Sequence, residues 1–329
     1  MFGMFISGIE SSVCQKTGCY RGLLIDIHET FKTDEQCIEY LATLRWPDGV
    51  RCVVCGSDQV RQYSSPTKKQ TGRKIYQCQE PTCKQQFTAT SGTIFHDTHL
   101  PLTKWFLALS VIVDAKKGIS AKQLQRHLNV GYKTAWYLAH RIRKAMEETG
   151  SPLLTGTVEI DETYIGGRTR GHARKFQDKD VVLGIRQRGG QLRLLQLENR
   201  KEATLYDAIS QHVDKGVERI MTDDNRAYNF KDTQYHNAER GTIRHSRKEY
   251  VRGDIHTNTV ESAFSLFKRG LVGSYHQLSI KHLQRYLNEF SYRFNRRDTR
   301  TLFEQTLQRM AMGKPMPFAE LTADEQASV

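Results

Sequence analysis

Two pairs of cysteines constrain the N-terminal part of this 329-residue chain more strongly than any other feature. Two residues separate Cys52 from Cys55, and four separate Cys78 from Cys83. Two such pairs, about twenty residues apart, can supply the four thiolates that tetrahedral Zn²⁺ prefers. The alternative is four unconnected buried thiols. We expect a zinc ribbon with one structural Zn²⁺ bound by these four cysteines.

The chain carries a large excess of positive charge, with 49 Lys and Arg residues against 36 Asp and Glu and a net charge of +13. Such an excess favours a polyanionic partner, usually nucleic acid, although binding to a membrane surface can produce the same balance. No apolar run approaches the roughly 20 residues of a membrane span. Seven cysteines, four of them with zinc spacing, fit a reducing compartment. We therefore expect a soluble intracellular protein with nucleic acid as its partner and no membrane partner.

A short helix, a tight turn and a basic helix follow the cysteines. Ser120 and Gln123 have the spacing of a capping box, and residues 129–131 form an Asn-Val-Gly turn. The next helix is expected over 132–146. This spacing predicts a helix-turn-helix whose later helix enters a major groove; the alternative is a helical bundle with a solvated basic face. The basic residues expected at DNA on this helix are Lys133, Arg141 and Arg143.

The second half of the chain has the pattern of a mixed α/β domain. Alternating or apolar runs predict strands over 157–165, 181–185 and 192–197, then a helix over 202–213 and a strand that ends at Asp223. Residues 240–252 form a less regular basic segment. Three strands, a helix, a strand and a further helix match a ribonuclease-H-like core.

Three acidic residues stand where such a core would bring carboxylates together. Asp161 lies on the first strand, Asp223 ends a later strand, and Glu261 lies on the polar face of an amphipathic helix over 256–269. Phosphodiester chemistry with two Mg²⁺ ions, about 4 Å apart, needs such a set. Glu261 could instead complete a capping box with Asn258. The acids that rival the three by proximity are Glu159, Glu162 and Asp224.

Several stretches resemble bacterial insertion-sequence DDE transposases of the zinc-ribbon type (the IS-fifteen-ninety-five family, ISXO-two-like). The matching stretches lie between about Asp34 and Arg297. Those in the first three strand and ribbon segments are Leu44-Arg-Trp-Pro-Asp-Gly49 with Cys52-x2-Cys55, Ile160-Asp-Glu-Thr-Tyr-Ile-Gly-Gly167, and Thr222-Asp223 with Tyr228. Those that follow are His256-x-Asn258-x-x-Glu261, Phe267-Lys-Arg-Gly270, Gly273-x-Tyr-His276, Tyr286-Leu-Asn-Glu-Phe290 and Arg293-Phe-Asn-Arg-Arg297. The Cys-x4-Cys pair departs from the family's commonest ribbon pattern.

The resemblance implies a role for each matching residue. Asp161, Asp223 and Glu261 correspond to the DDE triad, which binds Mg²⁺ or Mn²⁺, and the four cysteines correspond to the zinc ligands. Lys268 corresponds to the basic residue after the third acid. The residues expected to bind DNA on the amphipathic helix over 256–269 are His256, Asn258, Lys268 and Arg269.

The implied function is that of an insertion-sequence DNA transposase, a polynucleotidyl transferase that binds terminal inverted repeats and performs metal-dependent strand cleavage and transfer. Joining two DNA ends implies a homo-oligomer. The resemblance also implies a bacterial, cytoplasmic and nucleoid-associated protein whose partner is double-stranded DNA, both element ends and target. The alternatives are a domesticated or inactive DNA-binding copy and a metal-dependent nuclease without transposition.

The expected fold is therefore multidomain: a zinc ribbon and a helix-turn-helix module, then an α/β ribonuclease-H-like (retroviral integrase-like) catalytic domain. The expected divisions are an N-terminal extension (1–33), a helix plus zinc ribbon (34–98), the helix-turn-helix region (99–148), a linker (149–156), the catalytic domain (157–297) and a C-terminal tail (298–329).

Overall fold

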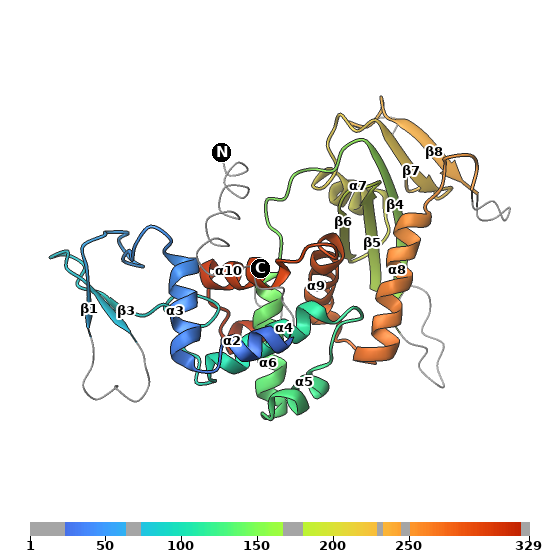
Figure 1. Cartoon of the computed structure of the whole chain (residues 1–329). Coiled ribbons are helices and arrows are strands. Elements are labelled where there is room, and N and C mark those ends of the chain that lie inside the picture. The colour runs from blue at the N-terminus through green and yellow to red at the C-terminus, as the bar shows by residue number, and fades with distance from the viewer. Residues whose placement is uncertain (1–23, 64–73, 167–179, 229–232, 245–250, 324–329) are drawn as a thin grey trace. The chain divides into compact units, whose positions relative to one another are not determined.

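A computed structural model describes residues 24–63, 74–166, 180–228, 233–244 and 251–323 (Figure 1). The chain divides into two compact units. Unit 1 combines residues up to Ala145 with those from Asp298 onward, and unit 2 comprises Met146–Arg297. Within the described residues, no helix has the length and apolar character needed to cross a bilayer.

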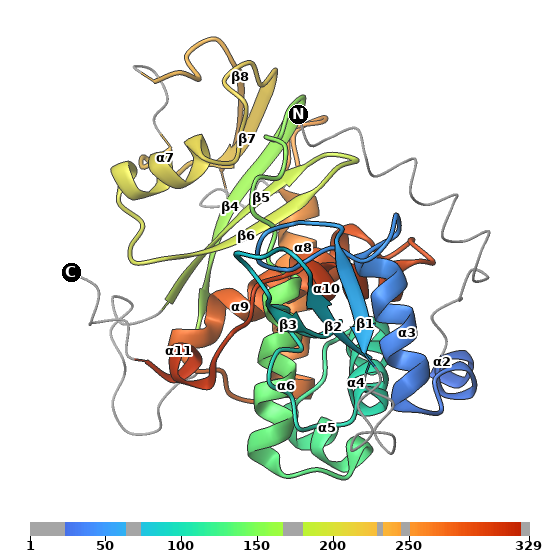
Figure 2. The same cartoon turned by 90° about the vertical axis from the view of Figure 1, so that its left-hand side faces the viewer.

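Unit 1 contains a small antiparallel sheet, visible in Figure 2. Its strands are β1 (Val60–Tyr63), β2 (Ile75–Cys78) and β3 (Gln86–Phe87). The rings of Trp46, Tyr76 and Phe87 pack together beside it, with centroids 5.5–5.9 Å apart. Strands this short bury little apolar surface, so this aromatic cluster and the neighbouring cysteines form the core of the module.

The rest of unit 1 is helical. Its helices are α2 (Leu24–Thr30), α3 (Asp34–Arg45), α4 (Leu102–Asp114), α5 (Ala121–Leu128), α6 (Tyr132–Ala145), α10 (Leu302–Met312) and α11 (Phe318–Thr322). Helix α4 is central because Trp105, Phe106 and Leu109 lie on its fully buried stripe. Phe303 of α10 places its ring 6.0 Å from that of Phe106. The region after Arg297, expected as a tail, thus contains a helix that packs within unit 1.

Two consecutive helices, α5 and α6, lie where the sequence predicts a short helix and a basic helix. The Ser120 hydroxyl accepts a hydrogen bond from the backbone N–H of Gln123 and caps α5. Asn129 ends α5 in the left-handed conformation, with φ of 49°, which lets the chain turn within three residues into α6. Leu124 and Leu128 of α5 are buried, so the pair of helices has an apolar contact face.

Unit 2 contains a five-stranded sheet. Its elements are β4 (Thr157–Ile165), β5 (Asp180–Gln187), β6 (Leu192–Leu197), α7 (Glu202–Ser210), β7 (Arg219–Asp223), β8 (Glu239–Ile243), α8 (Asn258–Gly270), the π-helical turn η4 (Leu271–Tyr275), the 3₁₀ turn η5 (Ile280–His282) and α9 (Leu283–Asn295). The strand order is β6-β5-β4-β7-β8. β4, β5 and β6 are antiparallel neighbours, whereas β7 and β8 run parallel to β4.

The strands predicted from apolar patterning are confirmed, but the sequence did not reveal β8. Its residues, Glu-Arg-Gly-Thr-Ile, have no clear alternation, and β8 owes its place to pairing along β7. Gly241 suits that place because a Cβ there would lie 2.2 Å from the sulfur of Met221.

Alternation of side chains along β4 gives the sheet two different faces. Val158 and Ile160 point into a core with Leu205 and Ile209 of α7. On the opposite face, α8 and α9 pack against the sheet through a second apolar cluster that includes Phe264. Glu159, Asp161 and Thr163 of β4 lie on this α8 side, so two of the three acidic residues of β4, Glu159 and Asp161, face the helix that carries Glu261.

Candidate active site and metal centres

The register of β4 and β7 brings Asp161 and Asp223 to the same level. Thr157 pairs with Arg219 and Glu159 with Met221, so each residue of β4 lies opposite one that is 62 positions later. The same offset joins Asp161 to Asp223, the last residue of β7. One carboxylate oxygen from each of Asp161, Glu162 and Asp223 lies within 4.8 Å of the others.

This carboxylate cluster favours a bound cation. Burial raises the pKa of the Asp161 carboxyl to about 8. The negative charges of Glu162, Asp223 and Glu261 act in the same direction. Converging oxygen ligands that repel one another are the donor set that Mg²⁺ or Mn²⁺ accepts, since a divalent cation offsets the repulsion. The residues present therefore fit a hard divalent ion.

Glu162, one of the rival acids, is held in the cluster by two neighbours. Its Oε1 accepts a hydrogen bond from Asn225 Nδ2 at 2.9 Å, and its Oε2 accepts one from the Tyr228 hydroxyl. Tyr228 is fully buried, and this burial, together with Glu162, raises its pKa well above the ordinary value. The segment after β7 thus orients a carboxylate of β4. Asp224, the third rival, is exposed and is not among the three clustered carboxylates.

Glu261 lies in the first turn of α8, near the cluster but not among its three clustered carboxylates. Its Oε1 accepts a hydrogen bond from the Thr257 hydroxyl at 2.6 Å. Thr257, rather than Asn258, is the N-cap, and no side-chain cap bond is present, so the capping box with Asn258 is not formed. Glu261 is close enough to raise the pKa of Asp161 through its charge.

Glu159, the remaining rival acid, is fully buried and holds the start of α8. Its Oε2 accepts hydrogen bonds from the backbone N–H groups of Thr259 and Val260, at 2.9 and 3.2 Å. Its Oε1 accepts one from Arg188 Nε at 2.7 Å and lies 3.2 Å from His256 Nδ1. Arg188 Nη2 also donates to the His256 carbonyl, a role that no sequence motif indicated.

The basic and polar residues on and near α8 that the sequence predicts to bind DNA have different surroundings. The Lys268 ammonium donates a hydrogen bond to the Thr163 hydroxyl, two residues beyond Asp161 on β4. Arg269 is exposed and donates to the Ser265 carbonyl of its own helix. Asn258 is exposed, whereas His256 is half-buried beside Glu159.

The four cysteines of unit 1 come together as a second candidate metal centre. Cys52 Sγ and Cys83 Sγ are 3.6 Å apart, as are Cys55 Sγ and Cys78 Sγ, and all four sulfurs lie within 4.8 Å of one another. Four thiolates at 2.3 Å from one Zn²⁺ in a tetrahedron would be about 3.8 Å apart. The arrangement fits structural zinc, and the longer loop between Cys78 and Cys83 does not prevent it.

The three residues of α6 that the sequence predicts to contact DNA divide between surface and interior. Lys133 is exposed in the first turn. Arg141 is buried, donates to the His96 carbonyl at 2.7 Å and stacks over the ring of Trp105 at 5.0 Å. Arg143 is 2% exposed. The basic pattern along α6 therefore includes two guanidinium groups in the interior of unit 1.

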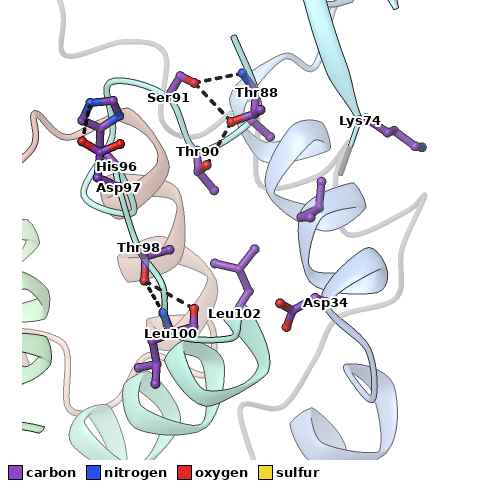
Figure 3. A pocket seen from close by; sticks show the side chains of 12 residues that line it. Asp34, Lys74, Thr88, Thr90, Ser91, His96, Asp97, Thr98, Leu100 and Leu102 are labelled. Carbon is purple, nitrogen blue, oxygen red and sulfur yellow. Dashed lines mark hydrogen bonds and ion pairs between the residues drawn. The ribbon is translucent and has the colours of Figure 1, made fainter. Parts of the chain in front are cut away.

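A cavity of about 230 Å³ in unit 1 is lined by no residue of either candidate centre (Figure 3). Thr88, Ser91 and Thr98 lie along its wall, and the N–H of Thr88 donates to Ser91 Oγ at 2.9 Å. Thr98 Oγ1 accepts from the N–H of Leu100 at 3.2 Å. These hydroxyls are bonded within the segment that forms the wall, and none of the sequence-predicted site residues lines the cavity.

Comparisons with known proteins agree with both centres. Residues 153–295 match the family model of the ISXO2-like transposase domain, and residues 32–86 match the transposase zinc-ribbon domain. The chain is 30% identical, over 282 residues, to a protein of Halobacterium salinarum described as an uncharacterized protein in transposable element ISH50. That alignment covers 80% of this chain and 92% of its relative. The chain therefore belongs to the ISXO2-like family of insertion-sequence transposases with an N-terminal zinc ribbon.

Proposed function

We propose that this chain is an active DNA transposase that cleaves and joins the ends of its own insertion sequence. Asp161, Asp223 and Glu261 are its reacting-site carboxylates. The observation that carries the proposal is the parallel register that sets Asp161 level with Asp223, below the first turn of the helix that bears Glu261. We assign unit 2 to the ribonuclease-H-like fold, because its strand order and its placement of acids suit that assignment.

The carboxylates would hold Mg²⁺ or Mn²⁺, which activates the attacking water or 3′-hydroxyl and stabilises the leaving oxygen. Asp161, in the middle of β4, and Asp223, at the end of the adjacent strand β7, supply ligands, and Glu261 supplies the third from α8. Glu162 keeps its orientation through Asn225 and Tyr228. The burial and mutual repulsion that raise the pKa of Asp161 to about 8 favour cation binding over an empty, fully charged cluster.

Lys268 is suited to a DNA phosphate close to this cluster. Its ammonium contacts Thr163, on the same face of β4 as Asp161, and the side chain is exposed. An ammonium here would contact a phosphate as a compact point charge. Arg269 and Asn258, both exposed on α8, extend this contact surface.

Unit 1 would recognise the terminal inverted repeats. The first turn of α6 exposes Tyr132, Lys133 and Thr134, the part of a recognition helix that reads base edges in a major groove. Arg141 and Arg143 instead stabilise the interior from which this turn projects. The zinc ribbon contributes a second, metal-stabilised DNA contact.

The test uses DNA from both flanks of the gene as labelled substrate, with the full chain and Mg²⁺ or Mn²⁺. We expect nicks at flanking inverted repeats, lost in Asp161→Asn and Glu261→Gln while DNA binding stays near normal. Asp207→Asn, which changes an exposed acid on α7, serves as the matched control and should cut like the wild type.

The rival functions predict other outcomes of the same assay. Specific binding to the repeats without any cutting would indicate an inactive or domesticated copy. Cutting without preference for the repeats would indicate a nuclease. Wild-type cutting by Asp161→Asn or Glu261→Gln would contradict the assignment of the carboxylates.

A further inference from the structure

A cleft in unit 2, of about 510 Å³, lies beside the carboxylate cluster, and four of its eight described lining residues are arginines. The only carboxylate among its described lining residues is that of Asp224. We call it the arginine cleft, and its guanidinium groups come from Arg226, Arg240, Arg244 and Arg252.

The arginine cleft shares a wall with the carboxylate cluster. Asn225 and Tyr228 both line the cleft, and both donate hydrogen bonds to Glu162. Glu162 in turn has a carboxylate oxygen within 4.8 Å of those of Asp161 and Asp223. A ligand in the cleft would therefore lie next to the atoms that react, not on a remote surface.

Positive charge in the cleft is arranged along an edge strand. Arg240, Thr242 and Arg244 are alternate residues at and just beyond β8, so their side chains point to the same side of the sheet. Alternate residues on a strand are about 7 Å apart. Two arginines whose Cα atoms have this spacing, with Arg226 also lining the cleft, suit an extended polyanion better than a single small anion.

Local interactions hold the far wall of the cleft in place. Arg252 Nη2 donates to the Thr242 carbonyl at 3.0 Å, and Arg252 pairs through its backbone with Ile255 across a tight turn. Arg219, at the start of β7, forms ion pairs with Asp254 in that turn and with Glu239 at the start of β8. The cleft is thus formed before any ligand arrives, which lowers the ordering cost of binding.

We propose that the arginine cleft binds backbone phosphates of the DNA strand that is cut at the carboxylate cluster. Guanidinium groups bind phosphates in a bidentate geometry, and such contacts position DNA without reading its sequence. This inference rests on the proposed function, because it places the substrate strand relative to the proposed reacting carboxylates. It adds binding residues on β8 to those expected on α6 and α8.

The experiment measures the affinity of the full, zinc-loaded chain for duplex DNA carrying an element end, over a series of KCl concentrations. The test variant replaces both Arg240 and Arg244 by Gln. The control replaces Lys201 and Lys215 by Gln, which removes the same charge from exposed positions of unit 2 outside the cleft.

We expect the arginine variant to bind more weakly at low salt and to lower the slope of log affinity against log salt by about 1.8, because each phosphate contact contributes about 0.9. The control should keep the wild-type slope. Replacing both arginines by Lys should retain most of the slope, since the charge remains. If the Gln variant does not fold, Arg226→Gln, at an exposed loop position, tests the same cleft with an expected decrease of about 0.9.

The failures of the two proposals are distinguishable. A wild-type protein that neither binds nor cuts element ends would overturn the proposed function. An active wild-type protein whose slope is unchanged in the arginine variant would overturn the cleft proposal alone.

Separate assays of nicking and of joining distinguish the two DNAs that could occupy the cleft, the strand that is cut and the DNA that receives it. Slower nicking in the arginine variant supports binding of the cut strand. Normal nicking with loss only of the joining of pre-nicked ends into a plasmid would assign the cleft to the receiving DNA and overturn the present assignment.

Discussion

Glu159 binds both the backbone N–H and the hydroxyl of Thr259, with donor distances of 2.9 and 2.7 Å to its Oε2. This contact joins β4 to the first turn of α8. Asp161 follows Glu159 by two residues, and Glu261 follows Thr259 by two. One buried carboxylate therefore fixes the relative position of two candidate metal ligands that are 100 residues apart in the chain.

Replacing Glu159 by Ala should uncouple α8 from β4. Arg188 and the N–H groups of Thr259 and Val260 would lose their acceptor, and we expect the free energy of unfolding to fall by about 3 kcal/mol. Nicking below the melting temperature should fall further than DNA affinity does, because the misplaced group is Glu261.

The controls for this prediction distinguish a change in the position of Glu261 from a general loss of protein stability. Glu159→Gln keeps one acceptor oxygen and should partly restore nicking. Glu218→Ala removes an exposed acid before β7 and should change stability by less than about 0.5 kcal/mol. Equal losses of nicking and DNA binding in Glu159→Ala would show that Glu159 has no specific effect on the position of Glu261.

The raised pKa of Asp161 predicts a pH-dependent stability in protein kept in chelator. Between the ordinary pKa of 3.8 and the raised value of about 8, the folded state binds more protons than the unfolded state. The free energy of unfolding therefore falls as pH rises through this window, and the loss is complete above about pH 8. Asp161→Asn removes this loss, so it should be more stable than the wild type at about pH 9, with a smaller difference at about pH 5.

Thermal melts of the wild type and Asp161→Asn across this pH range measure the difference. Added Mg²⁺ should raise the melting temperature of the wild type at the upper end of the range and have little effect on the variant. A difference that stays constant with pH would show that Asp161 keeps an ordinary pKa.

Gly184 on β5 lies opposite Asp161 on β4, and its lack of a side chain allows α8 to approach the sheet. A Cβ at this position would lie 2.6 Å from both Phe264 Cζ and Val260 Cγ2. Gly184→Ala should therefore cost about 1–3 kcal/mol of stability and slow nicking by moving α8 away from Asp161. Adding Phe264→Leu should recover part of both losses, as measured by denaturant unfolding and the nicking assay.

The matched control is Gly190→Ala, in the turn between β5 and β6. Its Cβ would meet only the flexible side chain of Gln187, which can move aside. If Gly184→Ala were as stable and as active as this control, close packing of α8 would not be required.

The cysteine cluster predicts one zinc ion per chain in protein purified without added metal. Replacing Cys52 or Cys78 by Ser should abolish this stoichiometry and unfold the ribbon, because metal binding supplies most of the stability of so small a module. Cys37→Ala changes a buried cysteine of α3 outside the cluster and should retain the zinc. Full zinc occupancy in Cys78→Ser, by elemental analysis, would contradict the ligand set.

The sequence was informative where a residue's role follows from local patterning. Apolar alternation predicted β4, and the strand that ends at Asp223 was also recognised. Spacing alone paired the cysteines that the structure brings together. In each case the signal lies within a few residues or in a repeated motif.

The remaining features depend on contacts between distant segments. The interior position of Arg141 depends on Trp105 and His96, which helical periodicity within α6 cannot reveal. Glu159 looked equivalent to Asp161 because the two lie on the same face of β4. Only the position of α8 distinguishes the two: Glu159 accepts a hydrogen bond from the start of this helix, whereas Asp161 lies beside Asp223. β8 likewise depends on pairing with β7.

The discontinuity of unit 1 has a consequence for the order of folding during synthesis. Ribosomes add about 5–20 residues per second, and domains fold as their residues emerge. All of Met146–Arg297 leaves the ribosome before α10 does, so unit 2 can fold while unit 1 still lacks Phe303 and the rest of that helix. The nascent chain would thus complete unit 2 first, and unit 1 would close only after α10 has left the ribosome.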